Sequence, residues 1–410
     1  MFSLGVSLRK ALFVAVDNKT KISETVFQHE KKRTHAEWSR NTLKILLTGI
    51  TGLVGASVAT ELLRKHPDSE FVAICRAGRT QTAQDRVERT IAEQCAFDGF
   101  PGQEKELMPR IQVVSGDVTA LPFDEIAKYG PFDVMFHCAA DVNLGKDPEG
   151  KTYATNMNGT INAIEAVRRF NIPIMHYVST AYVAGTCVGR VMEDEMPATG
   201  WINSYERSKF NAEKLVRESG IPFSIYRPSI IVGRLSDGLI RKPLAFYRIL
   251  EFLGSLKSHR CHKMGLPANG PLELSFRFQS GTSDKIYFVP VDYVQKSISR
   301  LFEIPVANKT YHITGESPVS TEMIAEALSC VLKTSGLTVV EKVENPTKEE
   351  LLMNKMIEDL IPYFTTQITF DNSNVRAALG DEILDWKQDI PFLKRMAYSF
   401  YKKEYTNLVD

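Results

Sequence analysis

The chain has 410 residues, of which 43% are hydrophobic and 24% are charged, an ordinary composition for a globular protein. Its formal net charge of +1 excludes the strongly basic surface that is typical of nucleic-acid-binding proteins, so we predict no nucleic-acid partner. The length predicts one large domain together with a smaller lobe.

Residues 1–42 are expected to form an N-terminal extension. Residues 1–16 carry two basic side chains and an apolar stretch that is too short for a typical signal sequence. We interpret this segment as a helix that packs on the body of the protein, and the alternative is docking to a membrane or a partner. Residues 17–42 are polar and charged, which is typical of a linker or a surface helix.

From Lys44 onward, short apolar strands alternate with helices. Strands are expected at residues 44–47, 70–75, 111–114, 134–138, 174–178 and 223–226. Helices are expected at residues 54–64, 84–94, 156–170 and 209–218. This alternation predicts an α/β fold over residues 43–233, with a doubly wound parallel sheet of the Rossmann type.

The alternation loosens after the sixth strand. A helix is expected at residues 320–332, and residues 341–363 are charged and helical in character. We therefore expect residues 234–410 to form mostly a smaller, mixed, substrate-binding lobe, with residues 286–315 returning to the Rossmann core.

The cysteines, the apolar runs and the spacing of possible ligands bear on the location of the protein in the cell and on metal binding. Six scattered cysteines without a C-x-x-C pair indicate a reducing compartment rather than a disulfide framework. No apolar run approaches the roughly 18 residues of a transmembrane helix, so we expect a cytoplasmic protein without an integral membrane segment. His259, Cys261 and His262 lie close in sequence, but no second pair stands at ligand spacing, so no metal site is predicted.

A glycine-rich loop follows the first strand and precedes the first helix, which is the required context for a pyrophosphate-binding loop. Gly49 would permit the tight turn, Gly52 the approach of backbone to phosphate, and Gly55 the close packing of helix and strand. The helix N-terminus adds free N–H groups and a positive dipole end. The residues predicted to bind the cofactor here are Gly49, Thr51, Gly52, Leu53, Val54 and Gly55.

The end of the second strand predicts which nicotinamide cofactor binds. NAD-dependent enzymes usually place an acid there for the ribose 2′-hydroxyl, whereas this chain has Arg76, with Arg79 and Arg86 following. A guanidinium binds the 2′-phosphate through charge-assisted hydrogen bonds. We therefore predict NADP(H), bound by Arg76 and Arg86, while Arg79 is as readily interpreted as a solvated surface charge.

The ends of later strands supply the other predicted cofactor contacts. Asp117 can accept a hydrogen bond from the adenine amino group, and Val118 can pack on the ring. Ala139 and Ala140, at the end of the fourth strand, leave room for the ribose and nicotinamide at the switch point of the sheet.

Four further positions near these strand ends carry predictions or open alternatives. Pro228 and Ser229 are expected to meet the nicotinamide carboxamide through their backbone, and Arg227 would either assist or act as a structural ion-pair partner. Asn156 would either hold a helix kink and a water near Lys209 or cap a turn.

The catalytic prediction rests on Tyr205 and Lys209, which form a Y-x-x-x-K pattern with both side chains on one helix face. A nearby ammonium favours the phenolate, so Lys209 is expected to lower the pKa of Tyr205, which then acts as a general acid. Tyr205 and Lys209 are also expected to bind the cofactor, with Lys209 holding the nicotinamide ribose. Thr180, at the end of the fifth strand, would polarise the same carbonyl oxygen, with Ser179 as the alternative hydroxyl.

Taken together, these segments resemble the extended short-chain dehydrogenases/reductases, and within them the thioester reductase and fatty acyl-CoA reductase ("male sterility") type of NAD(P)-binding domain. The G-x-x-G-x-x-G spacing resembles the wider superfamily, and the resemblance covers roughly residues 43–400. The segments that carry it are Thr48–Gly55, Arg76, Gly116–Asp117, His137–Asn143, Asn156–Thr160, Val178–Val183, Tyr205–Lys214, Tyr226–Gly233, Val289–Val294 and Tyr311–Gly315.

The resemblance implies an NADPH-dependent oxidoreductase that reduces an acyl thioester, bound to a carrier protein or to coenzyme A, to an aldehyde or alcohol. No adenylation domain or carrier serine motif accompanies the chain, so a carrier is expected to act in trans. Two alternatives stay open. One is other chemistry of the superfamily, such as an NADP-linked alcohol dehydrogenase or a sugar-nucleotide epimerase or dehydratase. The other is a non-catalytic NADP sensor.

Overall fold

The computed structural model describes residues 43–196, 200–281 and 283–409, so the predicted N-terminal extension lies outside the described residues. Residues 42–410 cluster into one compact unit. Within the described ranges, none of the helices combines the length and the apolar character that crossing a membrane requires.

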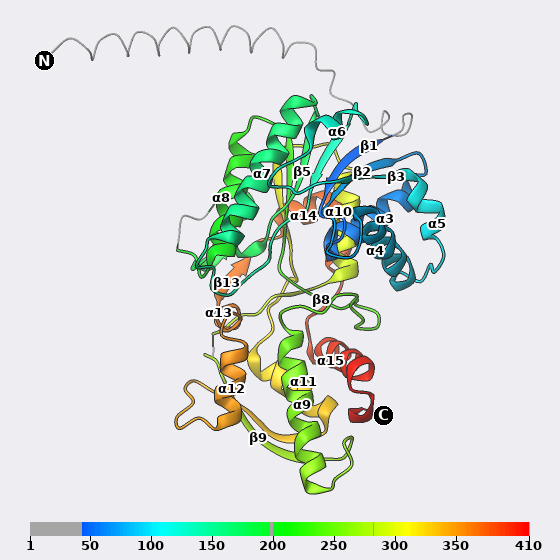
Figure 1. Cartoon of the computed structure of the whole chain (residues 1–410). Coiled ribbons are helices and arrows are strands. Elements are labelled where there is room, and N and C mark those ends of the chain that lie inside the picture. Colours follow the sequence, from blue (N-terminus) through cyan, green and yellow to red (C-terminus); the bar gives the residue numbers. More distant parts are fainter. Residues whose placement is uncertain (1–42, 197–199, 282, 410) are drawn as a thin grey trace, which may run out of the picture. The chain divides into compact units, whose positions relative to one another are not determined.

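A seven-stranded parallel sheet forms the centre of this unit and confirms the predicted α/β fold of the Rossmann type (Figure 1). Its strands are β1 (Lys44–Thr48), β2 (Glu70–Cys75), β3 (Ile111–Ser115), β4 (Val134–His137), β5 (Ile174–Val178), β7 (Phe223–Pro228) and β11 (Lys309–Ile313). The order across the sheet is β3-β2-β1-β4-β5-β7-β11, and all paired strands are parallel. The chain therefore reverses its winding between β1 and β4, which is where ligands bind in folds of this kind.

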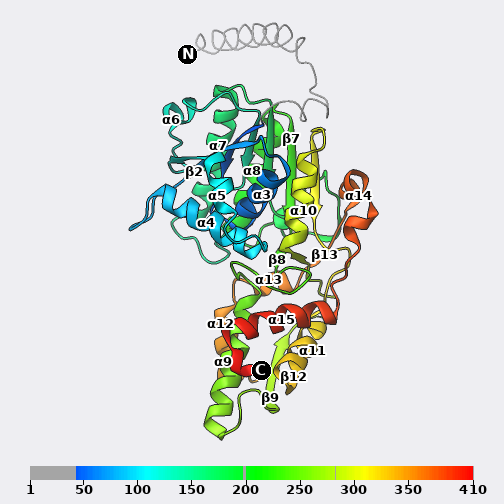
Figure 2. The ribbon, with the colours of Figure 1, turned by 90° about the vertical axis from the view of Figure 1, so that its right-hand side faces the viewer.

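Helices cover both faces of the sheet (Figures 1 and 2). On one side, α7 (Lys151–Arg169) packs against α8 (Ser204–Glu218). On the other side, α3 (Leu53–Lys65) packs against α10 (Val291–Phe302) and α4 (Ala83–Phe97). The short helices α5 (Glu104–Leu107) and α6 (Phe123–Ala127) complete this part of the chain.

The observed helices α7 and α8 begin earlier than the sequence predicts. Helix α7 begins at Lys151 instead of Asn156. Helix α8 begins at Ser204 instead of Lys209, because the Asn203 side chain accepts a hydrogen bond from the Glu206 backbone N–H and caps the helix. Tyr205 therefore lies in the first turn of α8, one turn before Lys209.

The lobe that follows the sixth predicted strand contains helices and short parallel strand pairs. Its elements are β8 (Ile230–Val232), α9 (Tyr247–Met264), β9 (Leu272–Gln279), β10 (Phe288–Pro290), α11 (Thr321–Leu332), β12 (Thr334–Val340), α12 (Lys348–Met356), α13 (Ile361–Phe364), β13 (Gln367–Phe370), α14 (Ser373–Leu379) and α15 (Ile390–Glu404). Strand β10 pairs with β8, β12 with β9, and β13 with β6 (Val188–Val191).

Residues 341–363, which the sequence predicts to be helical in character, contain helix α12 and the start of α13. Helix α12 begins only at Lys348, because Thr347 and Glu350 form a reciprocal capping box there, and α13 covers Ile361–Phe364. Helix α11 begins one residue after the predicted boundary and ends at Leu332, as expected.

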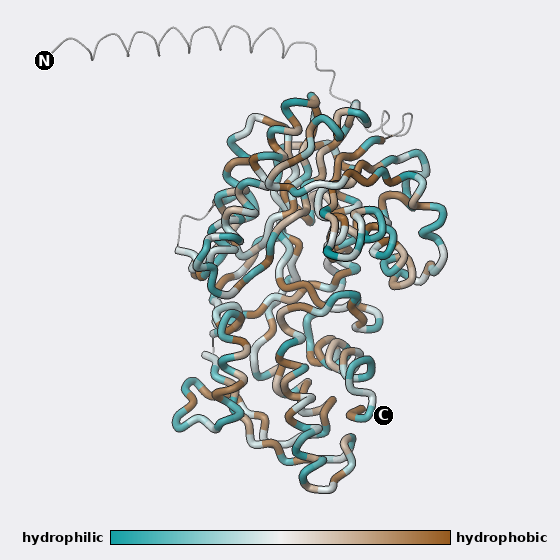
Figure 3. Tube along the Cα trace, in the orientation of Figure 1, coloured by the Kyte–Doolittle hydropathy of each residue, from teal (hydrophilic) through white to brown (hydrophobic). Residues whose placement is uncertain are grey.

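One hydrophobic cluster joins the lobe to the start of the phosphate-loop helix. Leu53 belongs to the same buried cluster as Phe246 and Tyr247 near the start of α9 and Tyr401 of α15. Hydrophobic stretches run through both the sheet and the lobe along the chain trace (Figure 3). This shared core places the lobe against the carboxyl ends of β1 and β4.

Candidate active site

Only glycine fits at the two ends of the predicted phosphate loop, at Gly49 because of its backbone conformation and at Gly55 because of a close contact. Gly49 has φ +86°, and a Cβ atom there would lie 2.6 Å from the Ala139 nitrogen. A Cβ atom on Gly55 would lie 2.2 Å from the Gly49 carbonyl oxygen. Between them, the Gly52 N–H donates to the Gly49 oxygen at 2.9 Å, and Gly52 is the N-cap residue of α3. The loop thus presents the N-terminus of α3 as a cradle for an anion.

The remaining predicted loop residues stand directly beside this cradle. Thr51 is half-buried next to Gly52, while Leu53 and Val54 form the first turn of α3 and are buried.

The two arginines predicted to bind the 2′-phosphate lie together at the ends of β2 and β3. The Arg76 guanidinium forms an ion pair with Asp117 at 3.4 Å, and the Arg76 side chain is 66% exposed. Arg86 reaches back from α4 and donates a hydrogen bond to the Arg76 carbonyl oxygen. An exposed ion pair of this kind contributes at most about 1 kcal/mol, so it leaves Arg76 available to an anionic ligand.

The neighbouring predicted contacts surround the switch point. Val118 faces helix α7, since a Cβ atom on Gly159 would lie 3.1 Å from its side chain. The Ala139 N–H lies 3.4 Å from the Thr48 hydroxyl, and Ala140 is exposed beyond it. The small side chains of Ala139 and Ala140 therefore leave the carboxyl ends of β1 and β4 open.

The side chain of Asn156 joins two segments of the chain near Lys209. Its side chain accepts from the Asp141 N–H at 2.7 Å and donates to the Asp141 carbonyl at 3.1 Å. The same amide donates to the Ser208 hydroxyl at 2.8 Å. Asn156 lies inside α7, so it caps no turn, and instead it ties the segment after β4 to the residue preceding Lys209.

Ser179 is engaged in a buried network away from Thr180. Its hydroxyl donates to Glu213 at 2.7 Å, and Glu213 forms an ion pair with Arg227 at 2.7 Å. Both charged side chains are fully buried. Burial alone would raise the pKa of Glu213, but Arg227 and Arg217 hold it at about 2. Arg227 is therefore the structural ion-pair partner that the sequence left as one of two alternatives.

Thr180 and Tyr205 meet at the end of β5. Thr180 is buried, its hydroxyl donates to the Pro228 carbonyl at 3.5 Å, and it lies near enough to Tyr205 to lower the pKa of that phenol. The Tyr205 side chain is half-buried in the first turn of α8.

The expectation that Lys209 lowers the pKa of Tyr205 is wrong for this structure. Desolvation raises the pKa of Tyr205, and the nearby Thr180 side chain opposes this only in part. The Lys209 ammonium instead donates to the Tyr177 hydroxyl at 2.7 Å and to the Val178 carbonyl at 2.8 Å. Burial lowers the pKa of Lys209 to about 8.

The predicted carboxamide contacts, Pro228 and Ser229, follow directly on β7. The Ser229 N–H already donates to the Ile313 carbonyl at 3.2 Å. The Ser229 hydroxyl is buried and has no hydrogen-bond partner among the described residues. An unsatisfied buried hydroxyl is costly, so this atom fits a site that a polar ligand completes. With the glycine cradle, it makes these residues suitable for a nicotinamide dinucleotide.

Sequence reasoning missed Arg241, which reaches the phosphate loop from the lobe. Its guanidinium donates to the Gly52 carbonyl at 2.9 Å and to the Gln94 side chain at 2.9 Å, and its side chain is only 9% exposed. No periodicity or motif surrounds Arg241 in the sequence, so its contact with a loop about 190 residues earlier has no local signal.

His137 is a second missed residue. It lies at the end of β4 and is buried, with its ring 2.7 Å from the Thr48 hydroxyl. Burial, with a further effect of Lys209, lowers the pKa of His137 to about 3, so the ring is neutral and structural.

The comparisons with known proteins agree with the fold. The NAD-binding family model described as male sterility protein matches residues 47–298. A nonribosomal peptide synthetase of Aspergillus flavus, asaC, is 23% identical over 384 residues, which are 82% of this chain and 34% of that protein. The chain thus spans about a third of the length of this relative.

Two solved structures share the fold. One is the terminal R domain of the myxalamid PKS-NRPS pathway, with a TM-score of 0.71, 22% identity and coverage of 90% of this chain and 93% of that one. The other is a thiolation-reductase di-domain of an archaeal non-ribosomal peptide synthetase, with a TM-score of 0.65, 18% identity and coverage of 94% and 83%. Because the family model matches more than half of the chain, this protein belongs to the male sterility protein family of NAD(P)-binding domains.

Proposed function

We propose that this protein is an NADP(H)-dependent reductase that converts an acyl thioester, on a carrier protein or coenzyme A, to an aldehyde or alcohol. The observation that carries the proposal is the meeting of Thr180 and Tyr205 beside the glycine cradle, with Lys209 one turn further along α8. A hydroxyl pair at this position can hold the oxygen of a carbonyl group next to a bound nicotinamide.

The relatives support the thioester as the substrate class. One solved structure of the same fold is a terminal R domain, and another joins a reductase to a thiolation domain. This supports a carrier-bound thioester. The relatives do not favour the alternatives of an epimerase, a dehydratase, an alcohol dehydrogenase or a non-catalytic sensor.

The side chains at the site provide the acid and the positioning for the reaction. When bound, the nicotinamide supplies the hydride that the carbonyl carbon of the thioester accepts. Thr180 donates a hydrogen bond to the carbonyl oxygen, and Tyr205 donates its proton to that oxygen, which gives a hemithioacetal. Cleavage of its C–S bond then releases the aldehyde and the carrier thiol. Because desolvation raises the pKa of Tyr205, the phenol keeps its proton until the oxygen becomes basic.

The buried ammonium of Lys209 supports this step without touching Tyr205. It holds the end of β5 through the Val178 carbonyl, two residues before Thr180. Its pKa of about 8 leaves it mostly charged at neutral pH, so it can attract the electron-rich oxygens of a ribose.

The first test is a product analysis with NADPH and an acyl thioester of pantetheine. We expect NADPH oxidation and a matching amount of aldehyde or alcohol. Tyr205→Phe should reduce turnover by about 10²- to 10⁴-fold, because the acid is lost, while NADPH binding measured by fluorescence changes little. Tyr129→Phe removes a phenol outside the site and serves as the control. Full turnover by Tyr205→Phe would overturn the assignment of the acid.

The cofactor preference is tested by Arg76→Glu. The new carboxylate repels the 2′-phosphate, so NADPH affinity should fall by about tenfold or more, while NADH affinity changes little. Isothermal titration with both nucleotides measures the two affinities, and Arg89→Glu on α4 is the charge-matched control. Equal losses for NADPH and NADH would contradict the preference for NADP(H).

A further inference from the structure

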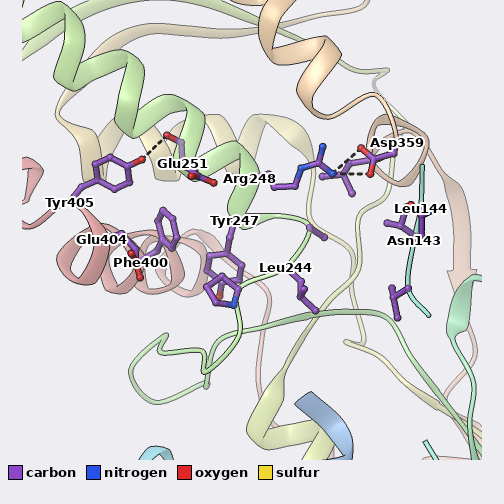
Figure 4. A pocket seen from close by; sticks show the side chains of 14 residues that line it. Asn143, Leu144, Leu244, Tyr247, Arg248, Glu251, Asp359, Phe400, Glu404 and Tyr405 are labelled. Carbon is purple, nitrogen blue, oxygen red and sulfur yellow. Dashed lines mark hydrogen bonds and ion pairs between the residues drawn. The ribbon is translucent and has the colours of Figure 1, made fainter. Parts of the chain in front are cut away.

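A pocket of about 710 Å³ lies between the segment after β4 and the helices of the lobe (Figure 4). Val142, Asn143 and Leu144 form one wall, and residues of α9 and α15 form the other. The volume is within the range of about 300–1,000 Å³ that is typical of small-molecule sites. Nothing in the site described above uses this space.

The walls of the pocket are anchored to the candidate active site. Asn156 holds both backbone groups of Asp141, so the segment that continues into Val142 starts from a fixed position. On the other wall, the Tyr247 hydroxyl accepts a hydrogen bond from the Gly233 N–H at 2.8 Å, four residues after Ser229. Both walls therefore extend directly from segments that are predicted to border the nicotinamide.

Part of the lining is apolar and exposed to solvent. Val142 is 58% exposed and Leu244 is 43% exposed, so both present apolar surface to the pocket. The ring centroids of Tyr247 and Phe400 are 5.5 Å apart, and those of Phe400 and Tyr405 are 6.2 Å apart. A ligand with an apolar stem would cover the aliphatic side chains and reach these rings.

The charged residues of the pocket leave an excess of carboxylate. Arg248 and Asp359 neutralise each other, since one guanidinium nitrogen contacts both carboxylate oxygens, at 2.9 and 2.8 Å. Glu404 has a weak contact of 3.6 Å with its sequence neighbour Lys403. No ion pair involves the Glu251 carboxylate within the described residues. An anionic group in the pocket would be repelled, whereas a cation would be attracted.

The carboxylates and rings lie together at the end of the pocket away from the active site. Figure 4 shows Glu251, Glu404, Phe400 and Tyr405 on the side opposite Asn143 and Leu144. Aromatic faces and carboxylates both bind ammonium ions in proteins. A chain that enters along Leu144 would thus place its far end among these groups.

We propose that this pocket binds the acyl group of the substrate, and that it selects acyl groups with an apolar stem that ends in an ammonium or another cationic group. The proposal rests on the proposed function, because it assumes that the acyl group belongs to a thioester reduced at Thr180 and Tyr205. Glu251 and Glu404 are the specificity-determining residues, assisted by the faces of Phe400 and Tyr405.

The test uses three pantetheine thioesters of matched length, namely hexanoyl, 6-aminohexanoyl and adipoyl, with the full chain and NADPH. We expect kcat/KM to be about tenfold higher for 6-aminohexanoyl than for hexanoyl, and lowest for adipoyl. In the double variant Glu251→Gln/Glu404→Gln the ratio of 6-aminohexanoyl to hexanoyl should fall toward 1. Glu326→Gln, an exposed glutamate on α11 outside the pocket, should keep the wild-type ratio.

The outcomes separate this proposal from the proposed function. Reduction of all three thioesters without a charge preference, or a preference unchanged in the double variant, would overturn the proposal and leave the reductase intact. If no thioester is reduced, the proposed function fails. Titration calorimetry with a non-reducible 6-aminohexyl thioether of pantetheine then tests the pocket independently of turnover. Binding to the wild type that the double variant loses supports the proposal, and equal binding to both proteins overturns it.

Discussion

The two ends of helix α8 each bury a carboxyl group, but they do so in opposite ways. Glu206 in the first turn and Glu213 two turns later are both 0% exposed. Glu213 contacts two arginines and the Ser179 hydroxyl, and its pKa is held at about 2. Within the part of the chain that the structure describes, no cation forms an ion pair with Glu206, and desolvation raises its pKa to about 7. Burial is common to both, so the partner decides which form of the carboxyl group the fold stabilises.

The difference follows from what each end of α8 faces. The Glu213 end lies against β7 and receives Arg227 from that strand. The Glu206 end faces Tyr363 of the lobe, and the Ile202 N–H and the ring of Tyr182 also lie beside the carboxyl group. One oxygen of Glu206 and the Tyr182 hydroxyl have no hydrogen-bond partner among the described residues. The sheet end is thus fully satisfied, and the lobe end is not.

Removing the charge at the sheet end should have the largest effect. Glu213→Gln leaves the Arg227 guanidinium buried without a counterion, so the free energy of unfolding should fall by about 3–5 kcal/mol. Urea denaturation followed by circular dichroism measures this loss. Arg76→Gln breaks an exposed ion pair instead and should cost less than about 1 kcal/mol. Similar losses for the two variants would contradict the distinction between buried and exposed pairs.

Removing the ionisable carboxyl group of Glu206 should raise the free energy of unfolding relative to the wild type, by an amount that depends on pH. The unfolded chain loses the Glu206 proton near its ordinary value of 4.5, whereas the folded chain keeps it up to about pH 7. Folding therefore binds a proton in this window, and stability falls as the pH rises through it.

Glu206→Gln has no titratable proton at this position, so it does not undergo this loss of stability as the pH rises. Relative to the wild type, the free energy of unfolding of Glu206→Gln should rise by about 3 kcal/mol between pH 4.5 and pH 8. Urea titrations at four pH values measure the trend, and Glu326→Gln should show no such trend. A flat difference across the window would mean that the Glu206 pKa is not raised.

The smallest effect concerns the cap that starts α8. Asn203→Ala removes the acceptor of the Glu206 N–H and the donor to the Tyr363 hydroxyl, which should cost about 1 kcal/mol. Asn203→Asp keeps the cap and loses only the donor, so it should retain most of the stability. Thermal unfolding of both variants measures how much of the stability loss comes from the cap and how much from the contact with Tyr363. If Asn203→Asp loses as much as Asn203→Ala, the contact with Tyr363 matters more than the cap.

Much of the fold was predictable because its signals are local. Each strand of the sheet up to β7 is a short apolar run, and the glycine loop stands between a strand and a helix. The start of α8 was predicted too late because a single side chain, Asn203, decides it. The pairs β8–β10 and β6–β13 join segments far apart in sequence, and their strands of three or four residues carry no periodicity that could reveal them.

The candidate site was predictable as a set of positions but not as a set of contacts. Thr180, Tyr205 and Lys209 could be selected from their spacing, yet the partners of Lys209 are Tyr177 and Val178, which the spacing does not reveal. The pKa of Tyr205 depends on desolvation, which sequence cannot measure. The pocket has no sequence signal at all, because its walls come from segments around residues 142, 247, 359 and 404.

The bond from Arg241 to the Gly52 carbonyl has a consequence for how fast and how tightly a nucleotide binds. Because that oxygen is already occupied and the loop is braced from the lobe, the turn does not have to order itself when a pyrophosphate arrives. The loop loses its conformational entropy during folding instead, so the association of a nucleotide should approach the diffusion-limited rate. Losing the brace should slow association more than it speeds dissociation, which makes Arg241 a determinant of binding kinetics.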